Sequence, residues 1–128
     1  MNAWDESDLF RVGRAEELQL ASRRPDGSLS VFTTIWVVRV GDAAYVRSAR
    51  GPEGAWYRRA LRYGEGRIRA GGVEADVSFE HISADDAELH AALDAAYHGK
   101  YDSFGPAVVG PVVGPDAAAV TLRVDPKG

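Results

Sequence analysis

The stretch that decides the fold is "LSVFTTIWVVRV", which runs from Leu29 to Val40. It is rich in β-branched and aromatic residues, which favour strands, and neither of its alternating faces is polar throughout. Ile35 and Val37 share one face, whereas Trp36 and Val38 lie on the other. A long strand that is apolar on both faces suits a small barrel whose outer wall is also covered, by a helix, a ligand or a second subunit.

Turn signals stand on both sides of this strand. Upstream, Leu18 to Ser22 is typical of a short strand, and Arg24-Pro-Asp-Gly27 predicts a turn because proline fixes φ and glycine accepts a positive φ. Downstream, Gly41-Asp42 supplies a two-residue turn into a strand from Ala43 to Ser48. The first three strands are therefore predicted to form an antiparallel meander.

The rest of the chain alternates between helical and extended patterns. Glycines 71 and 72 separate two strands in a second hairpin, and a looser stretch from Gly105 to Pro115 leads to the last strand. Ser83 is the predicted N-cap of the third helix, and Pro52 stands in the first turn of the second. The predicted helices cover residues 5–17, 53–63 and 85–101, and the later strands cover residues 67–70, 73–80 and 118–124.

Composition limits the possible functions. The chain has 128 residues, 45% of them hydrophobic, which fits one domain over residues 1–128. Its net charge is −4, which does not favour a nucleic-acid partner. It has no cysteine, so disulfides, thiolate catalysis and cysteine zinc sites are excluded. No apolar run approaches the roughly 20 residues of a membrane span, so a cytoplasmic protein with no membrane partner is expected.

Positive charge gathers in one segment, "YVRSARGPEGAWYRRAL", from Tyr45 to Leu61. A loop here leads into the start of a helix, where free N–H groups and the helix dipole favour an anion. We therefore predict an anion site, with Arg47 and Arg50 as ion-pairing groups and Ser48 and the Gly51 backbone as donors. The alternative is that these arginines pair with nearby carboxylates and only solubilise the surface.

Aromatic residues and one lysine supply further candidates. Trp56 is assigned to the core, whereas Tyr57 is left open between core packing and contact with a planar ligand. On the third helix, Tyr97, Lys100 and Tyr101 are expected near a groove of cofactor size, or at its rim. The structural alternative is that Lys100 extends past buried aromatic rings to reach solvent.

Other chemical motifs are absent or weak. His90, Asp94 and His98 are spaced four residues apart along one helical edge, as metal ligands can be, but this edge lies opposite the apolar stripe and is expected to be solvated. No metal site is predicted. The sequence also lacks a Ser-His-Asp order, a Walker loop and a Rossmann fingerprint, so hydrolase and kinase functions have no supporting residues.

Four segments carry a resemblance to a known family: "WVVRVGDAAYVRSARGPEGAWYRRAL", "GRIRAGGVEADVSF", "LDAAYHGKY" and "VTLRVDP". The chain resembles a small bacterial family of unknown function, related to the deazaflavin-dependent nitroreductases and to the flavin-binding split barrels. The resemblance implies an α+β fold. It would be a split β-barrel of about six mainly antiparallel strands, with an N-terminal helix, a helix after the third strand and a helix before the last.

Two functions from different classes remain open, of which the resemblance implies the first. The first is an oxidoreductase that binds FMN or a deazaflavin coenzyme, in which Arg47, Ser48, Arg50 and Gly51 hold the phosphorylated tail and the cofactor supplies the hydride chemistry. The second is a cofactor-free barrel that binds a small molecule or serves as a dimeric accessory protein. A homodimer is expected in either case, from the dimeric habit of the resembling proteins and from the doubly apolar strand.

Overall fold

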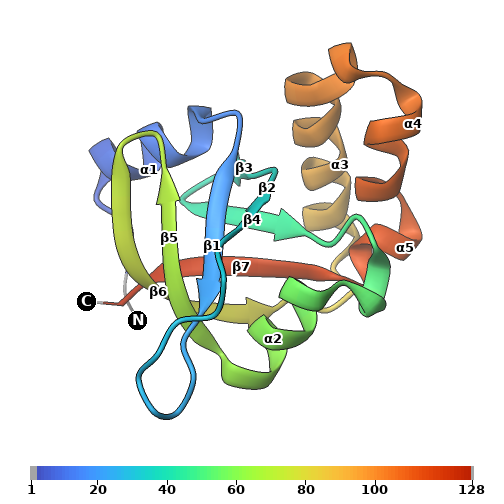
Figure 1. The fold of residues 1–128 in the computed structure, drawn as a ribbon. Helices are drawn as coiled ribbons and strands as arrows, with labels where there is room; N and C mark the ends of the chain where they lie inside the picture. The colour runs from blue at the N-terminus through green and yellow to red at the C-terminus, as the bar shows by residue number, and fades with distance from the viewer. Residues whose placement is uncertain (1–2, 128) are drawn as a thin grey trace.

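The computed structural model describes residues 3–127, in which strands form the centre and helices lie around it (Figure 1). The strands are β1 (Leu18–Ser22), β2 (Thr33–Ile35), β3 (Val38–Val40), β4 (Ala43–Arg47), β5 (Glu65–Ala70), β6 (Val73–His81) and β7 (Thr121–Pro126). The helices are α1 (Glu6–Arg14), α2 (Ala55–Tyr63), α3 (Ala87–Tyr101), α4 (Pro106–Val109) and α5 (Pro115–Ala118), with 3-10 turns η1 (Gly51–Glu53), η2 (Asp102–Phe104) and η3 (Gly110–Val112). The predicted single domain covers residues 1–128, of which 1, 2 and 128 lie outside the described range.

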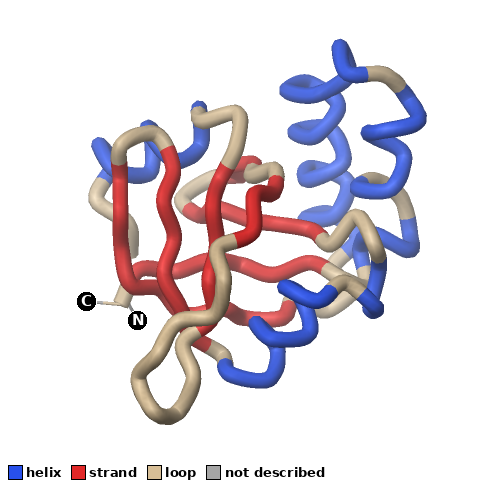
Figure 2. Tube along the Cα trace, in the orientation of Figure 1, coloured by secondary structure: helices blue, strands red, loops and turns tan. Residues whose placement is uncertain are grey.

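All seven strands of the described residues belong to one antiparallel sheet, in the order β2-β1-β5-β6-β7-β4-β3. The two edge strands, β2 and β3, are consecutive in the chain, and only Trp36 and Val37 separate them. The sheet must therefore curl until its two edges meet, as Figure 2 shows. The predicted α+β split barrel is confirmed.

The long strand predicted from Leu29 to Val40 is interrupted, which is why there are seven strands instead of about six. Its first part pairs with β1 in the register Leu18↔Ile35, and its last part pairs with β4 in the register Val38↔Tyr45. The pairing partner therefore changes from β1 to β4 between Ile35 and Val38. The chain bends at Trp36 and Val37, and the bend closes the barrel.

Two apolar clusters account for the two apolar faces of this segment. Val37 lies inside the barrel with Val46 and Leu122, whereas Val38 lies outside it in a second cluster with Leu93 and Tyr97. The outer face is covered by α3, one of the three kinds of cover that the sequence predicted. A second subunit is not needed at this part of the wall.

Several boundaries differ from the predicted ones for local reasons. The first helix is shorter than predicted and has Asp5 as its N-cap. The 3-10 turn η1 takes up residues 51–53, so α2 begins at Ala55 and not at residue 53. Asp86, not Ser83, caps α3, because its carboxylate accepts a hydrogen bond from the backbone N–H of Leu89.

The turn at residues 24–27 and the hairpin at glycines 71 and 72 form as predicted, with positive φ at Gly27, Gly71 and Gly72. The stretch from residue 105 to 115, predicted to be loose, forms the short helix α4, the turn η3 and the start of α5. No helix within residues 3–127 has both the length and the apolar character that crossing a membrane requires.

Candidate functional site

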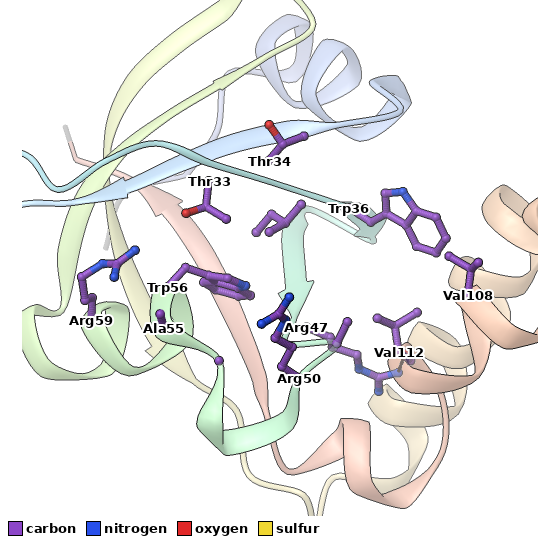
Figure 3. Close-up of a pocket in the computed structure, with 13 residues that line it drawn as sticks. Thr33, Thr34, Trp36, Arg47, Arg50, Ala55, Trp56, Arg59, Val108 and Val112 are labelled. Carbon is purple, nitrogen blue, oxygen red and sulfur yellow. Dashed lines mark hydrogen bonds between the residues drawn. The ribbon is translucent and has the colours of Figure 1, made fainter.

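A cleft of about 490 Å³ opens where the end of β4, the start of α2, strand β2 and the α4–η3 segment meet (Figure 3). Strand β2 contributes Thr33 and Thr34, and the α4–η3 segment contributes Val108 and Val112. Pockets for small molecules measure roughly 300 to 1,000 Å³, so the cleft is of a size to hold a ligand such as a cofactor.

Two tryptophans form aromatic walls of the cleft. Trp36, at the bend between β2 and β3, stacks on Tyr101 with a centroid separation of 4.0 Å and an interplanar angle of 5°. Trp56, in the first turn of α2, packs edge to face against Tyr57 at 6.0 Å. The indole rings are fixed from behind, which suits contact with a planar ligand.

Arg50 and Arg59 give the cleft its positive charge. Arg50 is exposed on the loop after β4, and Arg59 lies one turn after Trp56 on the same face of α2. In Figure 3 the two arginines lie on opposite sides of Trp56. Within residues 3–127 neither forms an ion pair, and no carboxylate lines the cleft. An anionic ligand is therefore the charge-complementary occupant.

The loop between β4 and α2 is held by its own hydrogen bonds. The Ser48 hydroxyl donates to the carbonyl oxygen of Gly51 at 2.7 Å, and the Gly51 N–H donates to the carbonyl oxygen of Ser48 at 3.0 Å. Gly51 has a φ of +64°, which glycine adopts without strain. Each of the two donors that the sequence assigned to an anion thus donates to a carbonyl oxygen inside the loop, and their role is to shape the loop.

The same loop leaves the start of α2 open. Its N-cap is Gly54, which has no side chain to accept from the first-turn N–H groups. A larger residue would displace the Ser48 hydroxyl, because a Cβ at Gly54 would lie too close to its oxygen. Gly54 and Ala55 line the cleft, so the positive end of the helix faces it.

Arg47 also lines the cleft, but its guanidinium turns toward Val112 (Figure 3). Its side chain is fully buried. The guanidinium donates to the Asp94 carboxylate at 2.6 Å, and its remaining contacts are Thr121 Oγ1 at 2.9 Å, the Val112 carbonyl oxygen at 2.9 Å and His90 Nδ1 at 3.0 Å. Four of its five N–H groups therefore have partners inside the protein. Arg47 joins the barrel to α3 and η3.

His90 and Asp94 do not form the solvated helix edge predicted from the sequence. His90 is buried between Arg47 and the carbonyl oxygen of Ser83, which its Nε2 contacts at 2.8 Å. Since Nδ1 accepts from Arg47, Nε2 carries the proton. His98 is exposed and contacts Asp102 at 2.7 Å. The prediction was wrong for the first two residues because a buried cation on β4 faces this edge of α3.

The aromatic candidates on α2 and α3 lie in the interior and do not line the cleft. Tyr57 and Tyr97 are buried, and burial raises the pKa of both phenols. The Tyr97 hydroxyl has no hydrogen-bond partner within the described residues. Tyr101 is also buried, which raises the pKa of its phenol to about 12. Burial lowers the pKa of Lys100 to about 8, and the nearby Glu16 carboxylate opposes this shift.

Sequence reasoning did not identify most residues that line the cleft. The spacing of Trp56 and Arg59 puts them on one helical face, which is a usable signal. Trp36 carries no such signal, because its exposure to the cleft depends on the bend that interrupts the strand. Val108 and Val112 come from a Gly/Pro-rich stretch without periodicity.

Comparisons with known proteins agree with this architecture. The chain belongs to a family described as "Uncharacterized protein conserved in bacteria (DUF2255)", whose model matches residues 8–124. No curated protein matches it in sequence. The resemblance inferred from the sequence motifs is confirmed by this family and by solved structures of similar fold.

Three solved structures illustrate the similarity. The heme storage protein HutZ from Vibrio cholerae has a TM-score of 0.66 and 17% identity, over 100% of this chain and 92% of HutZ. An F420 reductase has a TM-score of 0.60 and 20% identity, over 93% of this chain and 92% of the reductase. A FAD-binding protein from Mesorhizobium loti has a TM-score of 0.60 and 13% identity, over 98% of this chain and 92% of the FAD-binding protein. At these identities the likeness shows the fold alone.

Proposed function

We propose that this member of the family binds FMN or a deazaflavin coenzyme in the cleft and acts as an oxidoreductase on a small molecule. The observation that carries the proposal is a cleft of about 490 Å³ that combines two fixed indole rings with Arg50 and Arg59, which form no ion pair, and that no carboxylate among residues 3–127 lines. Similarity to an F420 reductase and a FAD-binding protein supports the same class of ligand.

The residues present fit such a cofactor. Arg50, Arg59 and the uncapped N–H groups at the start of α2 would hold the anionic tail, because all three favour negative charge. Trp36 and Trp56 would flank the planar ring system. Arg47 has no such role in this proposal, since its donors are used within the protein.

When bound, a flavin or deazaflavin supplies hydride transfer. The chain's own contribution is binding, orientation and exclusion of water. Among the described residues 3–127, those that line the cleft include threonines and arginines but no carboxylate, histidine, lysine, cysteine or tyrosine. None of them exchanges a proton readily near neutral pH. The cleft therefore favours a reaction that needs no acid or base from this chain.

Heme fits the cleft less well. Heme iron in proteins is held by histidine, cysteine, methionine or tyrosine. None of these residues lines the cleft within residues 3–127. The similarity to a heme storage protein thus extends to the fold, while the chemistry of this cleft favours a flavin-type ligand.

Titration of the purified protein with FMN, F420 and hemin tests the proposal by fluorescence and absorbance. We expect FMN or F420 to bind with a Kd of tens of micromolar or lower, and Arg50→Ala to weaken binding by about 10- to 100-fold, as for loss of one charged hydrogen bond. Arg58→Ala is the matched control, because Arg58 is exposed on α2 and does not line the cleft.

If neither FMN nor F420 binds the wild type at about 100 µM, the cofactor proposal is refuted, and binding of another small anion would then support a cofactor-free barrel. If a cofactor binds and Arg50→Ala binds it as tightly as the wild type, the anionic tail of the cofactor lies elsewhere.

A further inference from the structure

The bend that closes the barrel contains backbone groups that the sheet does not pair. The β1–β2 ladder ends at Ile35, and the β3–β4 ladder begins at Val38. Val37 lies between them with a fully buried side chain. A buried N–H or carbonyl group must find a partner elsewhere.

Two adjacent residues at the end of α3 provide these partners. The Val37 N–H donates to the Tyr101 hydroxyl oxygen at 3.2 Å, and the Lys100 ammonium donates to the Val37 carbonyl oxygen at 2.6 Å. The Tyr101 hydroxyl has one proton, and the carbonyl oxygen of Glu16, at 2.6 Å, is closer than that of Val37, at 3.1 Å. We therefore assign the Tyr101 hydroxyl proton to the carbonyl oxygen of Glu16. The carbonyl oxygen of Val37 then accepts its hydrogen bond from Lys100.

Lys100 also reaches a third element. Its ammonium donates to the carbonyl oxygen of Gly13 at 2.9 Å, in the last turn of α1. A cation is favourable at this end of a helix. Together, Lys100 and Tyr101 join α3 to α1, to the segment before β1 and to the bend.

The residue next to Val37 is Trp36, which forms a wall of the cleft and stacks on the ring of Tyr101 at 4.0 Å. We propose that Tyr101 and Lys100 are positioning residues for the cleft: they hold the backbone of Val37 and thereby fix the Trp36 ring where a planar ligand meets it. This inference rests on the proposed function, because it assigns Trp36 to ligand contact.

The charge of Lys100 makes this arrangement sensitive to pH. Its neighbours are the carboxylate of Glu16 and the ring of Tyr101, whose centroid lies 5.1 Å from the ammonium. Gly13, whose carbonyl oxygen accepts from Lys100, packs against the side chain of Arg39, and Arg39 is paired with Glu6. Burial lowers the pKa of Lys100 to about 8. Above that pH the neutral amine still donates to Val37, but a charge-assisted hydrogen bond is roughly twice as strong as a neutral one.

The first test compares two Tyr→Phe variants on the same helix. Tyr101→Phe keeps the stacked ring and removes the hydroxyl, and we expect the Kd for FMN or F420 to rise about fivefold or more. Tyr97→Phe is the matched control: its hydroxyl is buried and unpartnered, and its side chain does not line the cleft. Equal affinities of the Tyr101→Phe variant and the wild type would overturn the proposal.

The second test needs no ligand, so it separates this inference from the proposed function. Protein labelled with 5-fluorotryptophan gives resonances for its three tryptophans, of which Trp36→Phe identifies one. We expect the Trp36 resonance to shift in Tyr101→Phe but not in Tyr97→Phe. The chemical shift of the Trp36 resonance should also change with pH near pH 8 in the wild type. It should not change with pH in Lys100→Met or Lys100→Arg. In Lys100→Arg it should equal the wild-type value at low pH, because arginine stays charged.

The positioning role would be refuted if Tyr101→Phe does not shift the Trp36 resonance and the resonance does not titrate near pH 8 in the wild type. This holds whatever the cofactor result. A resonance that responds as expected, in a protein that binds neither FMN nor F420, would support the positioning role and refute only the cofactor.

Discussion

Replacing Arg47 by methionine separates a structural arginine from a ligand-binding one. The change removes four hydrogen bonds from a fully buried guanidinium and leaves Asp94 without its cation. Breaking a buried ion pair costs about 3 to 5 kcal/mol. The Asp94 side chain is 34% exposed and keeps some hydration, which favours the lower part of this range. The unpaired Val112 carbonyl and His90 Nδ1 add to the loss.

We therefore expect Arg47→Met to lower the free energy of unfolding by about 3 to 5 kcal/mol, which for a domain of this size corresponds to a fall in Tm of roughly 10 to 20 °C. Asp94→Asn keeps an oxygen acceptor and loses only the charge, so a smaller loss of about 1 to 2 kcal/mol is expected. Arg50→Ala, which alters an exposed side chain without an ion pair, is expected to stay within about 0.5 kcal/mol of the wild type.

The assay is thermal and urea unfolding, both followed by circular dichroism, with ligand titration of the same samples under folding conditions. The expected pattern is a large stability loss for Arg47→Met and a binding loss for Arg50→Ala. A Tm of Arg47→Met within about 2 °C of the wild type, together with loss of FMN or F420 binding, would contradict the reasoning and return Arg47 to the ligand.

Three further outcomes are expected. Gly66→Ala should destabilise the protein by about 3 kcal/mol in urea unfolding, because a Cβ there would collide with the carbonyl oxygen of Ala21 on the neighbouring strand; an unchanged midpoint would mean that β1 and β5 can separate without cost. The pKa of Lys100 is about 8 in the folded chain, and its ordinary value is 10.5. Between these pH values Lys100 is therefore mostly protonated in the unfolded chain and mostly neutral in the folded chain. The stability of the wild type relative to Lys100→Met should therefore rise from pH 8 to 10.5, and a flat difference would contradict the lowered pKa. The homodimer expected from the sequence stays a prediction; sedimentation of a monomer at micromolar concentration would exclude it.

Local patterns were sufficient to predict most of the fold. Alternation, turn residues and helical spacing predicted the hairpins and the three longer helices near their observed positions. The bend at Trp36 and Val37 was not predictable in this way, because nothing in the local sequence marks it. It arises from a global requirement, that one segment pair with β1 on one side and with β4 on the other.

The candidate site was located only in part. The loop after β4 was correctly identified as a place where positive charge gathers, and Arg50 does line the cleft. Ser48, the Gly51 N–H and Arg47 have internal partners, which depend on tertiary contacts that charge and spacing do not reveal. Tyr97, Lys100 and Tyr101 share an apolar helix face, and that face packs against the barrel wall instead of the cleft.

The different roles of Arg47 and Arg50 follow from strand parity and from what covers the barrel. Tyr45 and Arg47 point to the same face of β4, and Tyr45 belongs to the outer cluster that α3 covers. A cation at the end of that strand lies under the helix, where the half-buried carboxylate of Asp94 pairs with it. Arg50 lies beyond the strand, in a loop that α3 does not cover, and can give its charge to a ligand. The loop that carries Arg50 is held by the hydrogen bonds between Ser48 and Gly51, so Arg50 is placed at the cleft before any ligand arrives.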